Sequence, residues 1–149
     1  RESLHGHALA MLARREHSAG ELRKKLNDIG GDADLIEDVI SQLQVRNLQS
    51  DVRFSESYVR SRAERGYGPR VIEMGLRDRG IDRESARLML ESSGYDWCEQ
   101  AIDLRQRRFG ADSPTAPKER ARQLRFLQCR GFAGREISAA FKGEVSYDD

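Results

Sequence analysis

The chain has 149 residues, of which 38% are hydrophobic and 34% are charged, and its formal net charge is +1. This apolar share is low for a globular domain, but the apolar residues are patterned, which indicates thin helical modules rather than disorder. No apolar run approaches the roughly 20 residues that a membrane-spanning helix needs. The chain has only two cysteines, Cys98 and Cys129, and no secretory signal pattern, so we expect a reduced, cytoplasmic protein.

The first 47 residues predict three short helices. A capping box at Ser18-Ala19-Gly20-Glu21 begins the second helix, because the serine oxygen accepts an early backbone N–H and the glutamate reaches back. Gly30-Gly31 ends that helix, and Asp32 caps the third. The apolar residues expected on the buried faces follow helical spacing. They are Leu9, Leu12, Ala13, Leu22, Leu26, Ile29, Leu35, Ile36, Val39, Ile40 and Leu43.

The same pattern returns 50 residues later, which marks a repeat architecture whose units bury part of their core against their neighbours. The matched positions are Ala13 with Ala63, Arg15 with Arg65, Leu26 with Leu76, Asp28 with Asp78, Gly30 with Gly80, and Asp32 with Asp82. In this second unit Ser50 or Asp51 begins a helix, Pro69 takes the first position of the next, and Asp82 caps the third. Gly75 costs its helix about 1 kcal/mol relative to alanine, so we expect close packing there.

A third, partial copy lies at an offset of 65, where Arg130-Gly131-Phe132 falls on Arg65-Gly66-Tyr67. An extra helix beginning at Asp96 and a linker over 110–117 separate the copies. The sequence therefore predicts an all-α fold of about nine helices, arranged as tandem three-helix repeats in an elongated, curved array. The predicted bounds are 1–47, 48–94 and 95–142, followed by a flexible acidic tail at 143–149.

The sequence does not indicate catalysis, a cofactor or a metal site. It has neither a Walker A loop nor a strand-linked GxGxxG motif. No nucleophile has an evident base partner. The three histidines, His5, His7 and His17, have no cysteine nearby and are too few to complete a zinc site. We therefore expect a protein that is not an enzyme and that carries no cofactor.

Basic residues are concentrated toward the C-terminal third, where residues 97–135 hold nine Lys/Arg against four Asp/Glu. Lys118, Arg122 and Arg125 recur at spacings of four and three, which places them on one face of a helix. The guanidinium group suits phosphate or carboxylate. Such a surface either follows a phosphate backbone or is an ordinary solvated face, and both interpretations stay open. The candidate binding residues are Arg53, Arg60, Arg62, Arg65, Arg70, Arg105, Arg107, Arg108, Lys118, Arg120, Arg122, Arg125 and Arg130.

Two aromatic residues, Tyr67 and Phe132, each follow an Arg-Gly pair and are assigned the same place in successive copies. They either stack on nucleic-acid bases or a partner, or fill the joint between helices. The repeat context favours the joint, because a core residue is required near the turn.

Several segments together carry a family resemblance. They are 47–54 (Asn-Leu-Gln-Ser-Asp-Val-Arg-Phe), 58–62 (Tyr-Val-Arg-Ser-Arg), 65–70 (Arg-Gly-Tyr-Gly-Pro-Arg), 80–82 (Gly-Ile-Asp), Asp96-Trp97 with Ala101, Phe109-Gly110, and 126–132 (Phe-Leu-Gln-Cys-Arg-Gly-Phe). In order and spacing they resemble the RecX family, bacterial regulators of the RecA recombinase, over about residues 8–142. Gln49-Ser50 and Gly75 depart from the family pattern.

The resemblance implies an all-helical array of three-helix units without catalytic residues. It implies a protein that binds the RecA–DNA filament along its groove and suppresses its ATPase, strand-exchange and co-protease activities, in homologous recombination, DNA repair and the SOS response. We expect a cytoplasmic monomer that contacts single- or double-stranded DNA weakly through its basic helices and does not bind membranes. The residues leave two alternatives, a stand-alone DNA-binding helical repeat protein and a structural adaptor whose binding is indifferent to salt.

Overall fold

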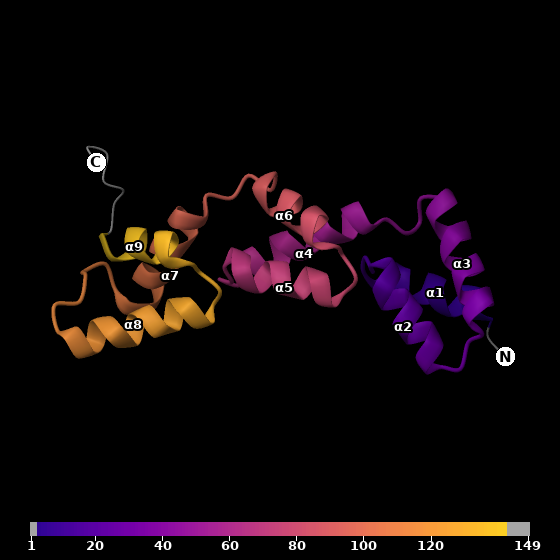
Figure 1. The fold of residues 1–149 in the computed structure, drawn as a ribbon, viewed down its shortest axis with the longest axis horizontal. Coiled ribbons are helices and arrows are strands. Elements are labelled where there is room, and N and C mark those ends of the chain that lie inside the picture. Colours follow the sequence, from indigo (N-terminus) through magenta and orange to yellow (C-terminus); the bar gives the residue numbers. More distant parts are fainter. Residues whose placement is uncertain (1–2, 143–149) are drawn as a thin grey trace. The chain divides into compact units, whose positions relative to one another are not determined.

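A computed structural model describes residues 3–142, and within this range the chain forms nine α-helices and no strand (Figure 1). They are α1 (Leu4–Arg14), α2 (Ala19–Asp28), α3 (Ala33–Val45), α4 (Asp51–Glu64), α5 (Pro69–Asp78), α6 (Arg83–Glu91), α7 (Trp97–Phe109), α8 (Pro117–Cys129) and α9 (Gly134–Lys142). The all-α prediction is confirmed. The predicted tail at 143–149 lies outside the described residues. None of these helices is both long and apolar enough to span a bilayer.

The helix starts follow the sequence signals. Ser18 and Glu21 form the reciprocal capping box at the start of α2. Pro69 is the first residue of α5. Asp96 accepts hydrogen bonds from the first backbone amides of α7, and Asp82 accepts one from the Ser85 amide in α6. The predicted repeat boundaries at 47/48 and 94/95 fall in the turns before α4 and before α7.

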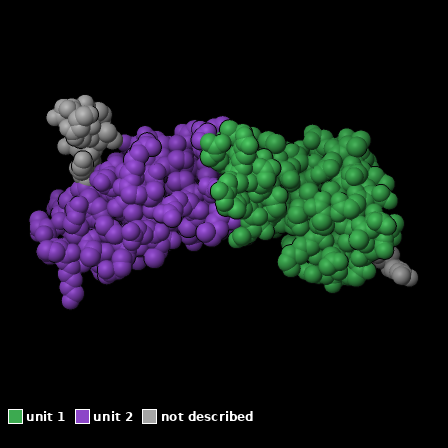
Figure 2. Space-filling model, in the orientation of Figure 1, with its two compact units in different colours: residues 1–58, 75–89 green, residues 59–74, 90–149 purple. Residues whose placement is uncertain are grey.

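The chain divides into two compact units (Figure 2). Unit 1 comprises residues 1–58 and 75–89, and unit 2 comprises 59–74 and 90–149. The division passes through the middle repeat, since α4, α5 and α6 each contribute residues to both units. Each unit therefore holds one terminal repeat together with the part of the middle repeat that packs against it.

In unit 1, α1–α3 share a core whose buried members are Ala8, Ala19, Leu22, Leu26, Ile36, Val39, Ile40 and Leu43. Four predicted core positions, Leu9, Ala13, Ile29 and Leu35, are wrong, because these residues are exposed. Leu9 is 38% exposed, because the covered face of α1 lies one residue earlier, at Ala8. Ile29 is 54% exposed because it is the C-cap of α2, where helical spacing no longer applies. Leu35, in the first turn of α3, is also exposed.

In unit 2, α7–α9 share the second core, with Ala101, Leu104, Leu127, Phe132 and Ile137 among its buried members. Helix α7 packs chiefly against α9 and also contacts α8. The sequence match had placed α7 between the copies, although the predicted bounds 95–142 include it, and in the structure α7 is part of the same three-helix core as α8 and α9.

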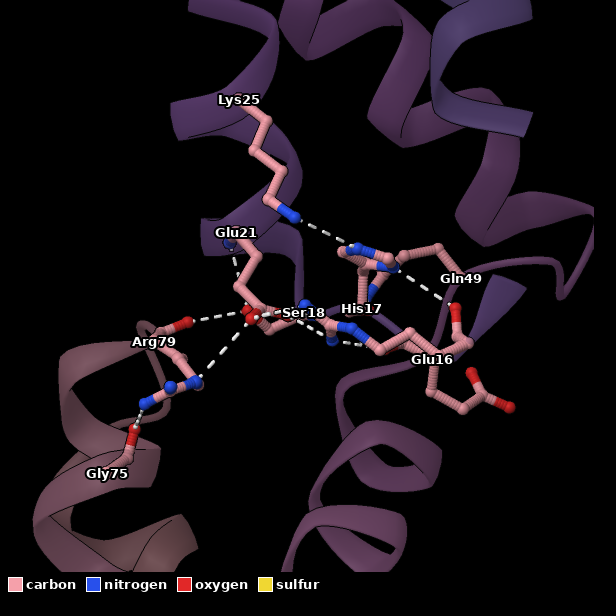
Figure 3. Close-up of polar contacts among 9 residues, drawn as sticks. Glu16, His17, Ser18, Glu21, Lys25, Gln49, Gly75 and Arg79 are labelled. Atoms are coloured by element: carbon pink, nitrogen blue, oxygen red, sulfur yellow. Dashed lines mark hydrogen bonds and ion pairs between the residues drawn. The ribbon is translucent and has the colours of Figure 1, made fainter. Parts of the chain in front are cut away.

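The joint between the first two repeats lies within unit 1 (Figure 3). Here the turn after α5 lies against the start of α2. The Ser18 hydroxyl donates to the Arg79 carbonyl at 2.7 Å, and the Arg79 guanidinium lies 3.5 Å from the Glu21 carboxylate. A Cβ on Gly20 would lie 2.6 Å from the Arg79 carbonyl oxygen, so the two backbones can meet only because Gly20 has no side chain.

The joint between the second and third repeats lies within unit 2 and is built in the same way. The turn after α8 lies against the start of α5. The Gly68 amide donates to the Arg130 carbonyl at 2.7 Å, and the Arg70 amide donates to the Gly131 carbonyl at 3.0 Å. A Cβ on Gly68 would lie 2.7 Å from the Gly131 carbonyl. In both joints, the turn between the last two helices of one repeat packs on the second helix of the preceding repeat.

Because the turn after α8 is equivalent to the turn after α5, the predicted offset of 65 between the second and third copies is wrong. Arg130-Gly131-Phe132 occupies the place of Arg79-Gly80-Ile81, and the position equivalent to Tyr67 at an offset of 50 is His17. The sequence match chose the wrong turn because Gly66, Gly80 and Gly131 all have positive φ and end their helices in the same way. In each case the next residue donates its amide back to a carbonyl five residues earlier. Arg-Gly-apolar is thus the signature of a helix end rather than of one particular turn.

Gly75 permits the close packing that its position predicted. A Cβ there would lie 2.0 Å from the Tyr58 hydroxyl oxygen, and the Arg79 guanidinium covers the same tyrosine ring at 4.9 Å. The Arg79 Nη1 also donates to the Gly75 carbonyl at 2.9 Å. Gly75 therefore helps to position Arg79, which contacts Ser18 and Glu21 at the first joint.

Arg105 was expected at a binding surface, and the structure contradicts this: the residue is fully buried, at 0% exposure. It lies one helical turn after Ala101, on the face of α7 that the core covers. Its guanidinium donates to the Ala140 carbonyl at 2.8 Å, to Gln123 Oε1 at 3.3 Å and to two carbonyls of the α7–α8 loop. Burial lowers the pKa of the Arg105 guanidinium from its ordinary value. Arg105 therefore links α7 to α8 and α9 inside the third repeat, and its side chain is not accessible to a partner.

Gly68→Ala should destabilise the second joint, because its Cβ would overlap backbone rather than a side chain that can move. We expect a loss of about 1–3 kcal/mol in the free energy of unfolding and faster hydrogen exchange of the Arg70 amide. Gly134→Ala is the matched control, since nothing lies within 4 Å of its Cβ position. Equal thermal unfolding temperatures for both variants would contradict this description of the joint.

Arg105→Met should cost about 1–3 kcal/mol, because it leaves buried oxygen acceptors without their donor. Arg107→Met, on the exposed face of the same helix and paired only with Asp103, should change stability by less than about 0.5 kcal/mol. Urea denaturation of both variants measures the difference. Equal midpoints would show that Arg105 has no structural role.

Candidate interaction surface

The structure brings the candidate basic residues together in unit 2, with two exceptions. Arg105 is buried in the core, and Arg53 lies in unit 1. Arg53 Nε donates to Glu16 at 2.8 Å and its Nη1 donates to Asn47 at 3.1 Å, so its charge is balanced locally. The remaining candidates lie on α4, α5, α7, α8 and the turns that follow α4 and α8. The exposed ones are Arg60, Arg65, Arg70, Arg107, Arg108, Lys118, Arg120, Arg122 and Arg125, and the half-buried ones are Arg62 and Arg130.

Helix α8 presents Lys118, Arg122 and Arg125 to solvent, in line with their spacing. Arg122 forms a bidentate pair with Glu119, at 2.9 and 2.7 Å. This pair, with a further hydrogen bond from Gln123, lowers the pKa of the Glu119 carboxyl to about 2. The carboxylate is therefore charged at neutral pH and offsets the charge of Arg122, whereas none of the ion pairs among residues 3–142 involves Lys118 or Arg125.

A second arrangement alternates guanidinium groups with aromatic rings, and we call it the arginine–aromatic cluster. Its members are Tyr67, Arg108, Phe109, Arg122, Phe126 and Arg130. The Phe109 and Phe126 rings meet edge to face, with their centroids 5.3 Å apart. Every member belongs to unit 2.

The ring of Phe126 is the centre of the cluster. The Cζ of Arg108 lies 4.7 Å from its centroid, and the Cζ of Arg130 lies 4.9 Å from it. Arg130 is also 5.1 Å from the centroid of Tyr67, and Arg122 is 5.0 Å from that of Phe109. Each such contact contributes about 0.5–1 kcal/mol at an exposed site.

Part of this cluster could have been found in the sequence. Arg122 and Phe126 are spaced four apart on one side of α8, and Arg130, the C-cap of that helix, follows at the same spacing. The grouping of Arg122 with Lys118 and Arg125 by charge alone obscured that pattern. Phe109 and Tyr67 come from other elements, and only the packing of α7 and of the turn after α4 brings them to the same place.

Tyr67 and Phe132 both lie at the second joint, but in different surroundings. Phe132 is 1% exposed and belongs to the core of α7–α9. Tyr67 is half-buried, and Arg130 covers its ring. Arg130 Nη1 also donates to the Arg65 carbonyl at 3.1 Å, which ties the third repeat to the turn that carries Tyr67.

No metal centre is formed within residues 3–142, since no three His, Cys, Asp or Glu side chains gather there. Cys98 and Cys129 are free thiols, and burial raises the pKa of Cys98.

Comparisons with known proteins agree with this architecture. The models for the first, second and third three-helix domains of RecX match residues 6–43, 50–90 and 95–141. The third match includes α7, in agreement with the core that this helix shares with α8 and α9.

Curated relatives match along nearly the whole chain. "Regulatory protein RecX" of Pseudomonas entomophila is 39% identical over 141 residues, which cover 95% of this chain and 91% of that protein. "Regulatory protein RecX" of Halorhodospira halophila is 42% identical over 139 residues, covering 93% and 86%. The crystal structure of RecX from Lactobacillus salivarius superposes with a TM-score of 0.76 at 23% identity, covering 93% of this chain and 92% of that one, which shows a common fold. With three successive domains matched, in order, to one family, the chain belongs to the RecX family of regulatory proteins.

Proposed function

We propose that this chain is a non-enzymatic inhibitor of RecA, which binds the RecA–DNA filament and suppresses its ATPase, strand-exchange and co-protease activities. The observation that carries the proposal is the match of all three domains to RecX, at about 40% identity to proteins named as its regulatory members. The inhibited activities come to this chain from the family resemblance.

The surface of unit 2 supports the proposal. A filament partner offers DNA phosphates and protein carboxylates, and both are bound well by planar, bidentate guanidinium groups. Arg60, Arg65 and Arg70 are exposed in unit 2, and Lys118 and Arg125 are exposed on α8. Such cations steer association and position a partner without reading base sequence.

The mode of action that we propose follows from the repeats. A protein built from tandem modules contacts a polymer over a longer stretch than a single module can. We expect a cytoplasmic monomer that bridges more than one filament subunit and thereby prevents the rearrangements on which RecA turnover depends. We propose that it acts without a cofactor of its own and that its direct contact with DNA is weak.

Addition of the purified protein should lower the ATPase rate of RecA on single-stranded DNA, in a saturable way. Arg60→Gln combined with Arg65→Gln should weaken inhibition several-fold, because two exposed cations of unit 2 are lost. The matched control is Arg77→Gln combined with Arg83→Gln, which removes the same charge from exposed positions in unit 1.

Unchanged RecA turnover at saturating protein would overturn the proposal. Tight, sequence-selective binding to duplex DNA in the absence of RecA would favour a stand-alone DNA-binding protein instead. Binding to RecA that is indifferent to salt would favour a structural adaptor.

A further inference from the structure

We propose that the arginine–aromatic cluster is a phosphate-binding site for single-stranded DNA, in which aromatic rings rather than carboxylates hold the guanidinium groups of Arg108 and Arg130 in place. The proposal deepens the proposed function, since it names a DNA contact for a protein that acts on a DNA filament. It concerns binding by this chain alone, and it can therefore be tested without RecA.

Arg108 and Arg130 lie against the same aromatic ring. Both lie within 5 Å of the centroid of the Phe126 ring, although one comes from the end of α7 and the other from the turn after α8. The ring therefore gathers two cations from separate elements around one point. Like charges repel, so this gathering requires a contact that offsets the repulsion, and the rings provide it.

The N–H donors of the Arg108 and Arg130 guanidinium groups stay available to a ligand. An aromatic ring contacts the flat face of a guanidinium group, whereas all five N–H donors lie in the plane of the group. Arg107 and Arg122 donate to Asp103 and Glu119 instead. Among the described residues no ion pair involves Arg108 or Arg130, and the Arg130 guanidinium donates only to the Arg65 carbonyl. These two groups are thus held beside the Phe126 ring yet retain donors for a bidentate anion.

The length of the row of cations along α8 favours a polymer as the ligand. Exposed cations continue from the cluster along α8, at Arg125 and Lys118. From position 118 to position 130, a helical rise of about 1.5 Å per residue gives a row of roughly 18 Å. A nucleic-acid strand carries one phosphate per roughly 3.4 Å of helix axis, so a row of this length matches several phosphates rather than a single small anion.

The aromatic rings of the cluster favour a single nucleic-acid strand over an acidic protein as the ligand. Phe109, Phe126 and Tyr67 are half-buried residues whose rings lie beside the cations. Proteins that bind single strands without sequence preference combine a cationic track with such rings, on which bases stack. Carboxylates of a protein partner would use the cations but would gain nothing from the rings.

The test measures binding of a fluorescent oligo(dT) by anisotropy, over a range of salt concentrations. Arg108→Gln combined with Arg130→Gln should weaken binding at least tenfold in about 0.1 M salt and reduce the slope of log K against log[salt] by about 1–2. The control with the same loss of charge is Arg77→Gln combined with Arg83→Gln, which should bind as the unaltered protein does.

Two further variants separate orientation from charge. Arg108→Lys combined with Arg130→Lys keeps both charges but loses the planar donor geometry, and it should bind at least threefold more weakly. Phe126→Leu leaves the net charge unchanged and should also weaken binding at least threefold, with the melting curve checked by circular dichroism. If the lysine variant, whose charges are intact, binds as tightly as the unaltered protein, the rings do not organise the site and the proposal is wrong.

The remaining outcomes distinguish this proposal from the proposed function. A protein that inhibits RecA but does not bind oligo(dT) would overturn the phosphate site alone. A protein that binds oligo(dT) through the cluster but leaves RecA unaffected would support the site and overturn RecA inhibition. Competition by poly-glutamate as strong as that by unlabelled oligo(dT) would overturn the nucleic-acid assignment in favour of an acidic protein surface.

Discussion

The structure depends on one contact that occurs twice, the close approach of a helix-ending turn to the start of a helix in the preceding repeat. Small residues make the approach possible at Gly20 and at Gly68, where a Cβ would overlap backbone atoms. The chemistry of the two contacts differs. The first uses a hydroxyl and an ion pair, through Ser18, Glu21 and Arg79, whereas the second uses backbone amides of Gly68 and Arg70. Hydrogen bonds between backbone groups are insensitive to side-chain charge, so the second joint is the less dependent of the two on salt and pH.

Around these joints, the arginines of this chain serve three distinct purposes. Arg79 and Arg130 link repeats, Arg105 satisfies carbonyl groups inside a core, and others such as Arg125 remain in solvent. A count of positive charge treats all of them alike. A guanidinium group whose donors are already used inside the protein has none left for a partner, so positive charge alone does not identify a binding surface.

Local signals in the sequence were sufficient to predict the helices but not their register. Caps such as Ser18 and Pro69 act within a few residues, so the chain itself specifies them. The third repeat was misaligned because Arg-Gly-apolar ends several helices, and only contacts between repeats show that Phe132 corresponds to Ile81. Arg105 was misplaced because burial of a charge depends on distant carbonyl groups, such as that of Ala140. The arginine–aromatic cluster could not be predicted in full, because Phe109 and Tyr67 come from other elements and only tertiary packing brings them to Phe126 and Arg130.

Arg130 has a double role that carries a thermodynamic consequence. It bonds to the Arg65 carbonyl and covers the ring of Tyr67, so its side chain forms part of the linkage between the second and third repeats. Any ligand that draws this guanidinium away must compete with those contacts, and any ligand that accepts it in place reinforces them. Occupancy of the cluster and rigidity of the neighbouring linkage are therefore reciprocally coupled, each altering the other by the same free energy.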